Sequence, residues 1–274
     1  MKLNTLAVIG AGNLAASVVP ALKKSGVEVT RIYSRTYEHA ASLAKRVDAQ
    51  AVRSISELGV ASFYLLSVRD NCIEEIATLT GKIADKDSVV VHTSGSTDIK
   101  VLKPYCANYG VLYPFQTFSA AKPITDFLSV PVFIEASSED VLLKLRELAE
   151  TISGKVLMLD STKRMGLHIA GAFSCNFVNS LLSCAFDICQ EFGIEPCDLK
   201  PLVEKTVEKA FEIGNPQEVQ TGPAVRGDTV TVEKHLKFLQ TNLGLQQVYA
   251  VMSEYIMNTK NVNRYGSKSQ YSDG

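Results

Sequence analysis

The sequence predicts an α/β protein in which a mostly parallel sheet, covered by helices, is followed by an all-helical region. Up to residue 160, short apolar runs alternate with segments of helical period. Continuous apolar strands separated by helices indicate a parallel sheet buried on both faces. Beyond residue 160 the strand signals nearly vanish. We therefore expect two domains, 1–160 and 161–274.

The elements follow from apolar runs and from the glycines that end them. Strands are expected at 3–9, 27–33, 62–66, 88–91, 111–113, 130–134 and 155–159, and helices between them at 14–24, 37–47, 72–79 and 141–152. The second domain should contain helices at 162–192, 198–213, 232–240 and 245–257, with a Gly/Pro-rich loop at 215–228. Gly26, Gly193 and Gly214 are good helix stops. The polar tail 258–274 is expected to fray.

Composition excludes several classes of protein. The 274 residues include 28 Lys and Arg against 29 Asp and Glu, a net charge of −1, which argues against a nucleic-acid binder with a large basic surface. Hydrophobic residues make up 46% and charged residues 21%, as in a globular protein rather than a disordered one. The six cysteines contain no Cys-x-x-Cys pair, so we expect no metal site, no disulfide framework and a cytoplasmic location.

One segment is long enough to cross a bilayer. Residues 165–186 contain no Asp, Glu, Lys or Arg. They include His168, Asn176 and Asn179, which are costly to expose to lipid. We therefore expect a buried helix of a soluble domain and no membrane partner.

The strongest motif, Gly-Ala-Gly-Asn-Leu-Ala at 10–15, lies between the first strand and the first helix. Gly10 permits a tight turn, and Gly12 lets the backbone approach a pyrophosphate. Asn13 and Leu14 open the helix, whose free N–H groups meet the phosphate charge. This strand–turn–helix pattern predicts a Rossmann-type dinucleotide-binding domain.

The end of the second strand indicates NADP rather than NAD. An NAD enzyme usually places a carboxylate there, whereas this chain has Ser34, Arg35 and Thr36. Two hydroxyls and a guanidinium suit a 2′-phosphate. The alternative is that Ser34 and Thr36 only cap the next helix while Arg35 is a solvated surface residue.

Ligands of such sheets bind beyond the carboxyl ends of the strands. We expect the cofactor also to contact small or hydroxyl-bearing residues after two later strands: Ser67, Val68, Thr93, Ser94 and Gly95. Tyr113 and Gln116, after the next strand, are expected to bind substrate. Asp70 and Ser96 could equally be helix caps.

The long helix carries an uncharged polar face. At about 100° per residue, His168, Asn176 and Asn179 fall on one side, and we expect them to face the nicotinamide, with His168 as proton donor. The alternative is structural packing, including packing between subunits. Cys175, at the margin of this face, is interpreted as a packing residue. Arg226, in the loop 221–228, could bind an anionic substrate or belong to a rigid turn with an Arg–Asp pair.

Together these motifs resemble one bacterial family, which joins a Rossmann-like NADP-binding domain to a helical domain of unknown function, number 2520. The resemblance rests on residues 10–15, 34–36, 92–96, 113–117, 176–179 and 221–228. Members are labelled NADP oxidoreductases, some by analogy with deazaflavin-dependent enzymes. The chain is more distantly similar to pyrroline-carboxylate reductase, prephenate dehydrogenase, ketopantoate reductase and the hydroxyisobutyrate dehydrogenases. The resemblance implies a homodimer built through the helical domain, and it names no substrate.

One departure affects the mechanism. Hydroxyisobutyrate-type enzymes place a proton-donating Lys about one turn before an Asn on the long helix, whereas this chain has Cys175 and Asn176 near Asn179. The donor is then His168 or a tyrosine such as Tyr113, or no reaction occurs. The sequence therefore predicts an NADP(H)-dependent oxidoreductase acting on a small carbonyl or imine between its two domains. The alternatives are a non-catalytic NADP-binding sensor and a deazaflavin-linked oxidoreductase.

Overall fold

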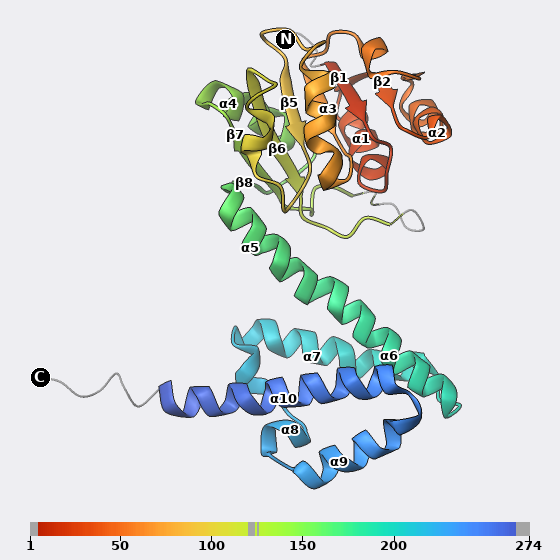
Figure 1. The fold of residues 1–274 in the computed structure, drawn as a ribbon, viewed down its shortest axis with the longest axis vertical. Coiled ribbons are helices and arrows are strands. Elements are labelled where there is room, and N and C mark those ends of the chain that lie inside the picture. The colour runs from red at the N-terminus through yellow and green to blue at the C-terminus, as the bar shows by residue number, and fades with distance from the viewer. Residues whose placement is uncertain (1–4, 120–123, 125, 267–274) are drawn as a thin grey trace, which may run out of the picture. The chain divides into compact units, whose positions relative to one another are not determined.

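A computed structural model of the chain describes residues 5–119, 124 and 126–266 (Figure 1). It divides into two compact units, 1–177 and 178–274. The boundary between the units lies inside the long helix, 17 residues after the predicted domain boundary at 160. The division into functional domains at 160 stays a prediction.

The described part of unit 1 contains one eight-stranded sheet with the order β3-β2-β1-β4-β5-β6-β7-β8. The strands are β1 (Thr5–Ile9), β2 (Glu28–Tyr33), β3 (Gln50–Val52), β4 (Phe63–Leu66), β5 (Val89–His92), β6 (Asn108–Pro114), β7 (Val132–Ala136) and β8 (Val156–Met158). All neighbouring strands are parallel except β6 and β7. The first six strands follow the Rossmann order, so the predicted fold class is confirmed. The short strand β3 was not expected from the sequence.

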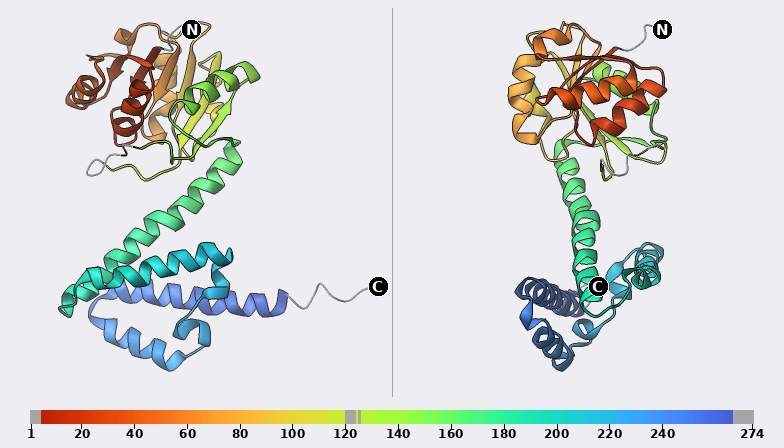
Figure 2. Two further views of the ribbon diagram at one scale, coloured as in Figure 1. Left: turned by 180° about the vertical axis from the view of Figure 1, so that it is seen from behind. Right: turned by 90° about the vertical axis from the view of Figure 1, so that its right-hand side faces the viewer.

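Helices cover both faces of this sheet, as the two views of Figure 2 show. They are α1 (Ala15–Lys24), α2 (Tyr37–Val47), α3 (Ile73–Thr80) and α4 (Glu139–Glu150). Leu6 and Val8 of β1 point into the core beneath α1, α2 and α4, whereas Ala7 and Ile9 point into the core beneath α3. This alternation explains why central strands read as unbroken apolar runs.

The long helix begins in unit 1 and is not a regular α-helix throughout. It consists of α5 (Ser161–Gly171), a π-helical segment (Ala172–Phe177) and, in unit 2, α6 (Val178–Glu191). The expectation of a constant α-helical period across 162–192 was therefore wrong for the π segment. The wider turns of a π-helix shift the angular position of every later residue. The expected burial was also wrong, because only Arg164 and Cys189 of this helix are buried.

By length and composition alone, the 31 residues Ser161–Glu191 could cross a membrane, and none of the most apolar stretch of this helix is buried.

The rest of unit 2 is helical: α7 (Lys200–Ile213), α8 (Pro223–Arg226), α9 (Thr229–Phe238) and α10 (Leu243–Gly266). The expectation of a frayed tail is wrong up to Gly266, and the part at 267–274 lies outside the described residues. Among the side chains described in unit 2, only Cys189, Ala224, Val232 and Ser253 are buried.

Candidate functional site

The carboxyl ends of six parallel strands meet at one edge of the sheet. The residues at these ends or just after them, taken along the order β3-β2-β1-β4-β5-β6, are Arg53, Ser34–Thr36, the glycine turn, Ser67 and Val68, Thr93–Gly95, and Tyr113–Gln116. Most residues that the sequence assigned to the cofactor thus lie along a single edge. Their order runs from the expected 2′-phosphate end to the expected nicotinamide end.

The glycine turn has the geometry that a pyrophosphate requires. Gly10 has φ of +100°, and a Cβ there would lie 2.0 Å from the carbonyl oxygen of Ser67. A Cβ on Gly12 would meet no heavy atom within 4 Å, so the space above this residue is open. Helix α1 begins after Leu14 with no side-chain cap and no acidic residue in its first turn. Its first N–H groups can therefore bind an anion.

The end of β2 also leaves its polar groups available. Thr36 occupies the N-cap position of α2 but makes no side-chain capping bond, so the capping alternative is wrong for this residue. Thr36 and Arg35 are exposed, and Ser34 is half-buried. These residues fit a 2′-phosphate, because a hydroxyl and a guanidinium are free to donate to its oxygens.

In the turn after β5, side-chain hydroxyls form hydrogen bonds with backbone groups of the protein. Ser94 Oγ accepts from the backbone N–H groups of Ser96 and Thr97, and Thr93 Oγ1 donates to the carbonyl of Leu66. The Ser96 hydroxyl in turn donates to the carboxylate of Asp70. Asp70 and Ser96 thus join the loops after β4 and β5. The predicted cofactor contacts of Thr93 and Ser94 stay predictions.

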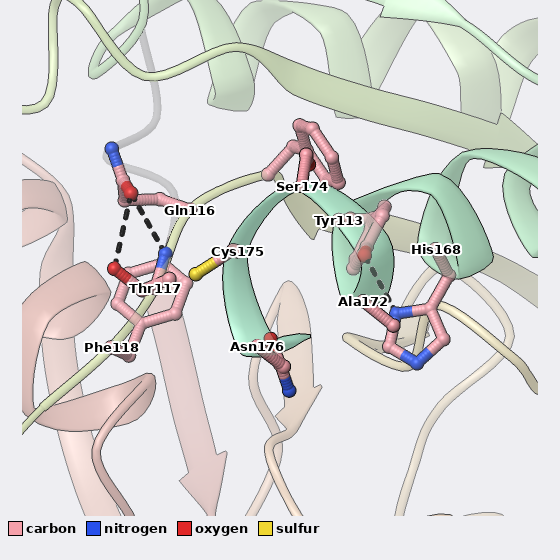
Figure 3. Close-up of a pocket in the computed structure, with 11 residues that line it drawn as sticks. Tyr113, Gln116, Thr117, Phe118, His168, Ala172, Ser174, Cys175 and Asn176 are labelled. Atoms are coloured by element: carbon pink, nitrogen blue, oxygen red, sulfur yellow. Dashed lines mark hydrogen bonds between the residues drawn. The ribbon is translucent and has the colours of Figure 1, made fainter. Parts of the chain in front are cut away.

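Two candidate proton donors form one pair. The hydroxyl of Tyr113, on β6, lies 3.0 Å from Nδ1 of His168, on α5 (Figure 3). A Cβ on Gly95 would lie 2.5 Å from Nδ1 of His168 and 2.8 Å from Cζ of Tyr113, so only glycine allows both rings to sit there. Burial raises the pKa of Tyr113, which keeps its phenol protonated at neutral pH.

An ion pair at the start of α5 fixes the helix that carries His168. Arg164, one turn earlier, is 1% exposed and binds the carboxylate of Glu135 on β7. Its guanidinium also donates to the carbonyl of Thr97, beyond β5. Ser161 donates to Glu135 through its N–H and its hydroxyl, at 3.1 and 2.8 Å. The first turn of α5 is therefore attached to the sheet at two places.

The pair opens onto a cleft of about 590 Å³ within unit 1. Its lining residues are Tyr113, Phe115, Gln116, Thr117, Phe118, His168, Gly171, Ala172, Ser174, Cys175 and Asn176. None of these is Asp, Glu, Lys or Arg. The side chain of Asn13 donates to the carbonyl of Phe118 at 3.3 Å, so the glycine turn touches the loop that borders the cleft.

The structure brings some predicted site residues together and not others. His168, Asn176, Tyr113 and Gln116 all line the cleft, although Gln116 Oε1 accepts from the backbone N–H of Thr117. Asn179 belongs to unit 2, so its role stays a prediction. Cys175, which the sequence indicated as a packing residue, also lines the cleft.

Arg226, in unit 2, is exposed and ends the short helix α8. The carboxylate of Asp228 caps α9 by accepting from the N–H of Thr231 at 3.0 Å. The hydrogen bond from the Thr231 hydroxyl is the largest cause of the lowered pKa of Asp228. This loop has the features of an inter-helix turn, and the substrate role of Arg226 stays a prediction.

Several cleft residues were missed by sequence reasoning. Phe115 and Thr117 belong to the motif at 113–117 but were given no role of their own, and Phe118, the next residue after that motif, was not considered. Ser174 enters the cleft from the π segment, for which the letters Ala-Phe-Ser-Cys-Asn-Phe carry no recognised signal. Among the described residues, no group of three His, Cys, Asp or Glu could hold a metal ion.

Two known families match parts of the sequence. The domain of unknown function DUF2520 matches residues 130–256, and the shikimate / quinate 5-dehydrogenase family matches residues 1–62. No curated protein matches the chain. Among solved structures, the "putative NADP oxidoreductase BF3122" of Bacteroides fragilis is 34% identical with a TM-score of 0.87, over 93% of this chain and 98% of that one. The chain belongs to this family of Rossmann-like NADP oxidoreductases with a DUF2520 domain.

Two further structures share the fold of the family at lower identity. Protein TM1727 of Thermotoga maritima is 22% identical with a TM-score of 0.65, over 94% of this chain and 99% of that one. An imine reductase of Myxococcus stipitatus, in complex with NADP+, is 16% identical with a TM-score of 0.71, over 94% of each chain. At these identities the likeness shows the fold alone.

Proposed function

We propose that this protein is an NADP(H)-dependent oxidoreductase that transfers hydride to or from a small carbonyl or imine compound, with His168 as the acid–base residue. The observation that carries the proposal is the Tyr113–His168 pair in a cleft beside the glycine turn. The family supports the oxidoreductase class and NADP, because the Bacteroides fragilis member is named for both.

The cofactor site is formed by residues of the sheet edge. The turn at Gly10 and Gly12 and the N–H groups near Asn13 and Leu14 bind the pyrophosphate. Ser34, Arg35 and Thr36 bind the 2′-phosphate. The loops at Ser67–Val68 and Thr93–Gly95 then lie beside the nicotinamide half, because β4 and β5 follow β1 in the sheet and lead toward β6.

NADPH, when bound, supplies the hydride that reduces the C=O or C=N carbon. The protein supplies the matching proton, which His168 gives to the substrate oxygen or nitrogen, since histidine exchanges protons readily near neutral pH. Tyr113 holds the imidazole through Nδ1 and leaves Nε2 for the substrate. In the reverse direction His168 accepts the proton.

The cleft favours an uncharged substrate. Its described lining combines aromatic rings with amides, hydroxyls and a thiol, and it contains no ionised carboxylate, ammonium or guanidinium. An ionised substrate group there would lose its hydration without gaining a countercharge. The amide of Asn176, in the lining of the cleft, can hydrogen-bond a neutral polar group. Asn179 is proposed as a further contact with the uncharged substrate.

The proposal is tested by following NADPH oxidation with a panel of ketones, aldehydes, cyclic imines and keto acids. We expect turnover on uncharged members, and a loss of about 100-fold or more in kcat for His168→Gln with NADP+ affinity retained. Gln keeps a hydrogen-bonding side chain without acid–base chemistry. Tight NADP+ binding with no turnover on any compound would contradict the enzyme proposal and support the non-catalytic sensor.

The protein is further proposed to be a homodimer through its helical unit. Large apolar side chains of this unit are exposed, including Phe211 at 84%, Leu202, Val251 and Phe238. Large apolar side chains that gather on a surface mark an interaction site. Sedimentation analysis should give twice the chain mass, and a monomer at micromolar concentration would contradict the proposal.

The free state of the six cysteines supports a cytoplasmic location.

A further inference from the structure

A second arginine lies beside the expected 2′-phosphate site. Strands β2 and β3 are parallel, and their register pairs Tyr33 with Val52. Arg53 is the first residue after β3, and Arg35 is the second after β2. Adjacent strands are about 4.8 Å apart, so the two arginines follow neighbouring strand ends at the same edge of the sheet. Both are exposed.

An aromatic ring holds the guanidinium of Arg53. Its Cζ lies 3.9 Å from the ring centroid of Tyr37, which is the first residue of α2 and follows Thr36 directly. A cation stacked on a ring is restrained in orientation, while the N–H groups at its edge can still donate. Arg53 is therefore held near the N-terminus of α2, where Ser34, Arg35 and Thr36 also lie.

The charge of this pair is not neutralised by the chain. Neither Arg53 nor Arg35 forms an ion pair within the described residues. Glu38, in the first turn of α2, is exposed and likewise makes no ion pair in this part of the chain. Two arginines that follow neighbouring strand ends, both without carboxylate partners, favour a ligand with two negative charges, since each offers a planar fork to phosphate oxygens.

We infer that Arg53, oriented by Tyr37, is a second guanidinium that binds the 2′-phosphate of NADP and sets the preference for NADP over NAD. The inference rests on the proposed function, because it concerns the same cofactor site. It predicts that the hydroxyls and Arg35 at the end of β2 are only half of the phosphate site. The other half comes from β3, a strand too short to be recognised from the sequence.

Calorimetry on the full-length protein measures the dissociation constants of NADP+ and NAD+. Arg53→Ala should weaken NADP+ binding about tenfold or more, because a charge-assisted hydrogen bond to phosphate is lost, and should change NAD+ binding less than twofold. The matched control is Arg46→Ala, which removes the same charge from the exposed last turn of α2. It should leave both constants within twofold of the wild type.

Variants of Tyr37 separate orientation from charge. Tyr37→Phe keeps the ring and should bind NADP+ within twofold of the wild type. Tyr37→Ala frees the guanidinium and should weaken NADP+ binding, by less than Arg53→Ala does, while NAD+ binding changes little. Thermal unfolding of each variant, with a midpoint close to that of the wild type, shows that the protein remains folded.

The outcomes distinguish this inference from the proposed function. An Arg53→Ala protein that keeps the wild-type ratio of NADP+ to NAD+ affinity would overturn the inference alone. An equal loss for Arg46→Ala would overturn it as well, because general charge would then explain the effect. A wild-type protein that binds neither nucleotide would overturn both.

Discussion

At Gly12 and Gly95 the missing side chain has two different purposes. The space above Gly12 is open, whereas a Cβ on Gly95 would collide with the rings of His168 and Tyr113. Gly12→Ala should therefore leave the unfolding midpoint unchanged and weaken NADP+ binding. Gly95→Ala should displace the pair and lower kcat about tenfold or more, because a small misplacement of catalytic groups is costly. Calorimetry and steady-state kinetics check both, and a Gly12→Ala protein with normal NADP+ affinity would contradict the cofactor site.

His92 couples the stability of unit 1 to pH. It ends β5, is fully buried and accepts from the N–H of Ser94, and its burial lowers its pKa to about 3. Between about pH 6.5 and pH 3 the unfolded chain therefore binds a proton on this residue that the folded chain does not. The stabilisation from neutral His92 is complete above the unfolded pKa and is lost as the pH falls.

His92→Gln, which cannot titrate at this position, isolates the effect when it is compared with the wild type. Between pH 7 and pH 4.5 the free energy of unfolding of the wild type should fall by about 2–3 kcal/mol more than that of the variant. Urea unfolding at the two pH values measures this difference. Equal changes in the two proteins would show that His92 does not retain its neutral form on acidification.

Individual residues were more predictable from the sequence than their pairing. The glycines at 10 and 12 were recognised because the turn lies between a strand and a helix. Tyr113 and His168 were considered as separate proton donors. They are 55 residues apart on different elements, and no periodicity relates them. Arg53 was not selected, because it follows a three-residue strand without a clear apolar pattern.

Among the described secondary-structure elements, α5 is attached to the sheet by an ion pair whose arginine is buried. Glu135→Ala would leave the guanidinium of Arg164, which is 1% exposed, without its countercharge. We expect the free energy of unfolding to fall by about 3–5 kcal/mol, the usual cost of an unpaired buried charge. Replacing both partners, with Arg164→Met and Glu135→Leu, should cost less. Urea unfolding measures both, and a loss below about 1 kcal/mol for Glu135→Ala would contradict the role of the pair.

The long helix shows where element prediction from the sequence fails. Its length was predicted closely, because the apolar run and Gly193 define it. The π segment at Ala172–Phe177 was not, since its sequence contains neither Gly nor Pro. Composition indicated burial, but composition does not say which surface covers a helix. The described chain leaves most of the side chains of this helix exposed.

At the scale of the whole molecule, the topology follows from local signals. Alternating apolar strands and helices predicted a mostly parallel sheet, and the order 3-2-1-4-5-6 places all the predicted phosphate and ribose contacts at one edge. The same signals could not predict the antiparallel pairing of β7 with β6, because strand direction depends on the path of the intervening loop. Nor could they place residues of unit 2 relative to the sheet.

The central claim is that NADP lies along this edge with its nicotinamide beside His168. The most direct measurement is NMR of protein labelled with 13C in its histidine rings, with the His168 signal assigned from His168→Gln. NADP+ should shift the His168 signal, whereas adenosine 2′,5′-bisphosphate, which lacks the nicotinamide, should bind and leave it in place. A His168 signal that NADP+ does not move, or that both ligands move equally, would contradict the account.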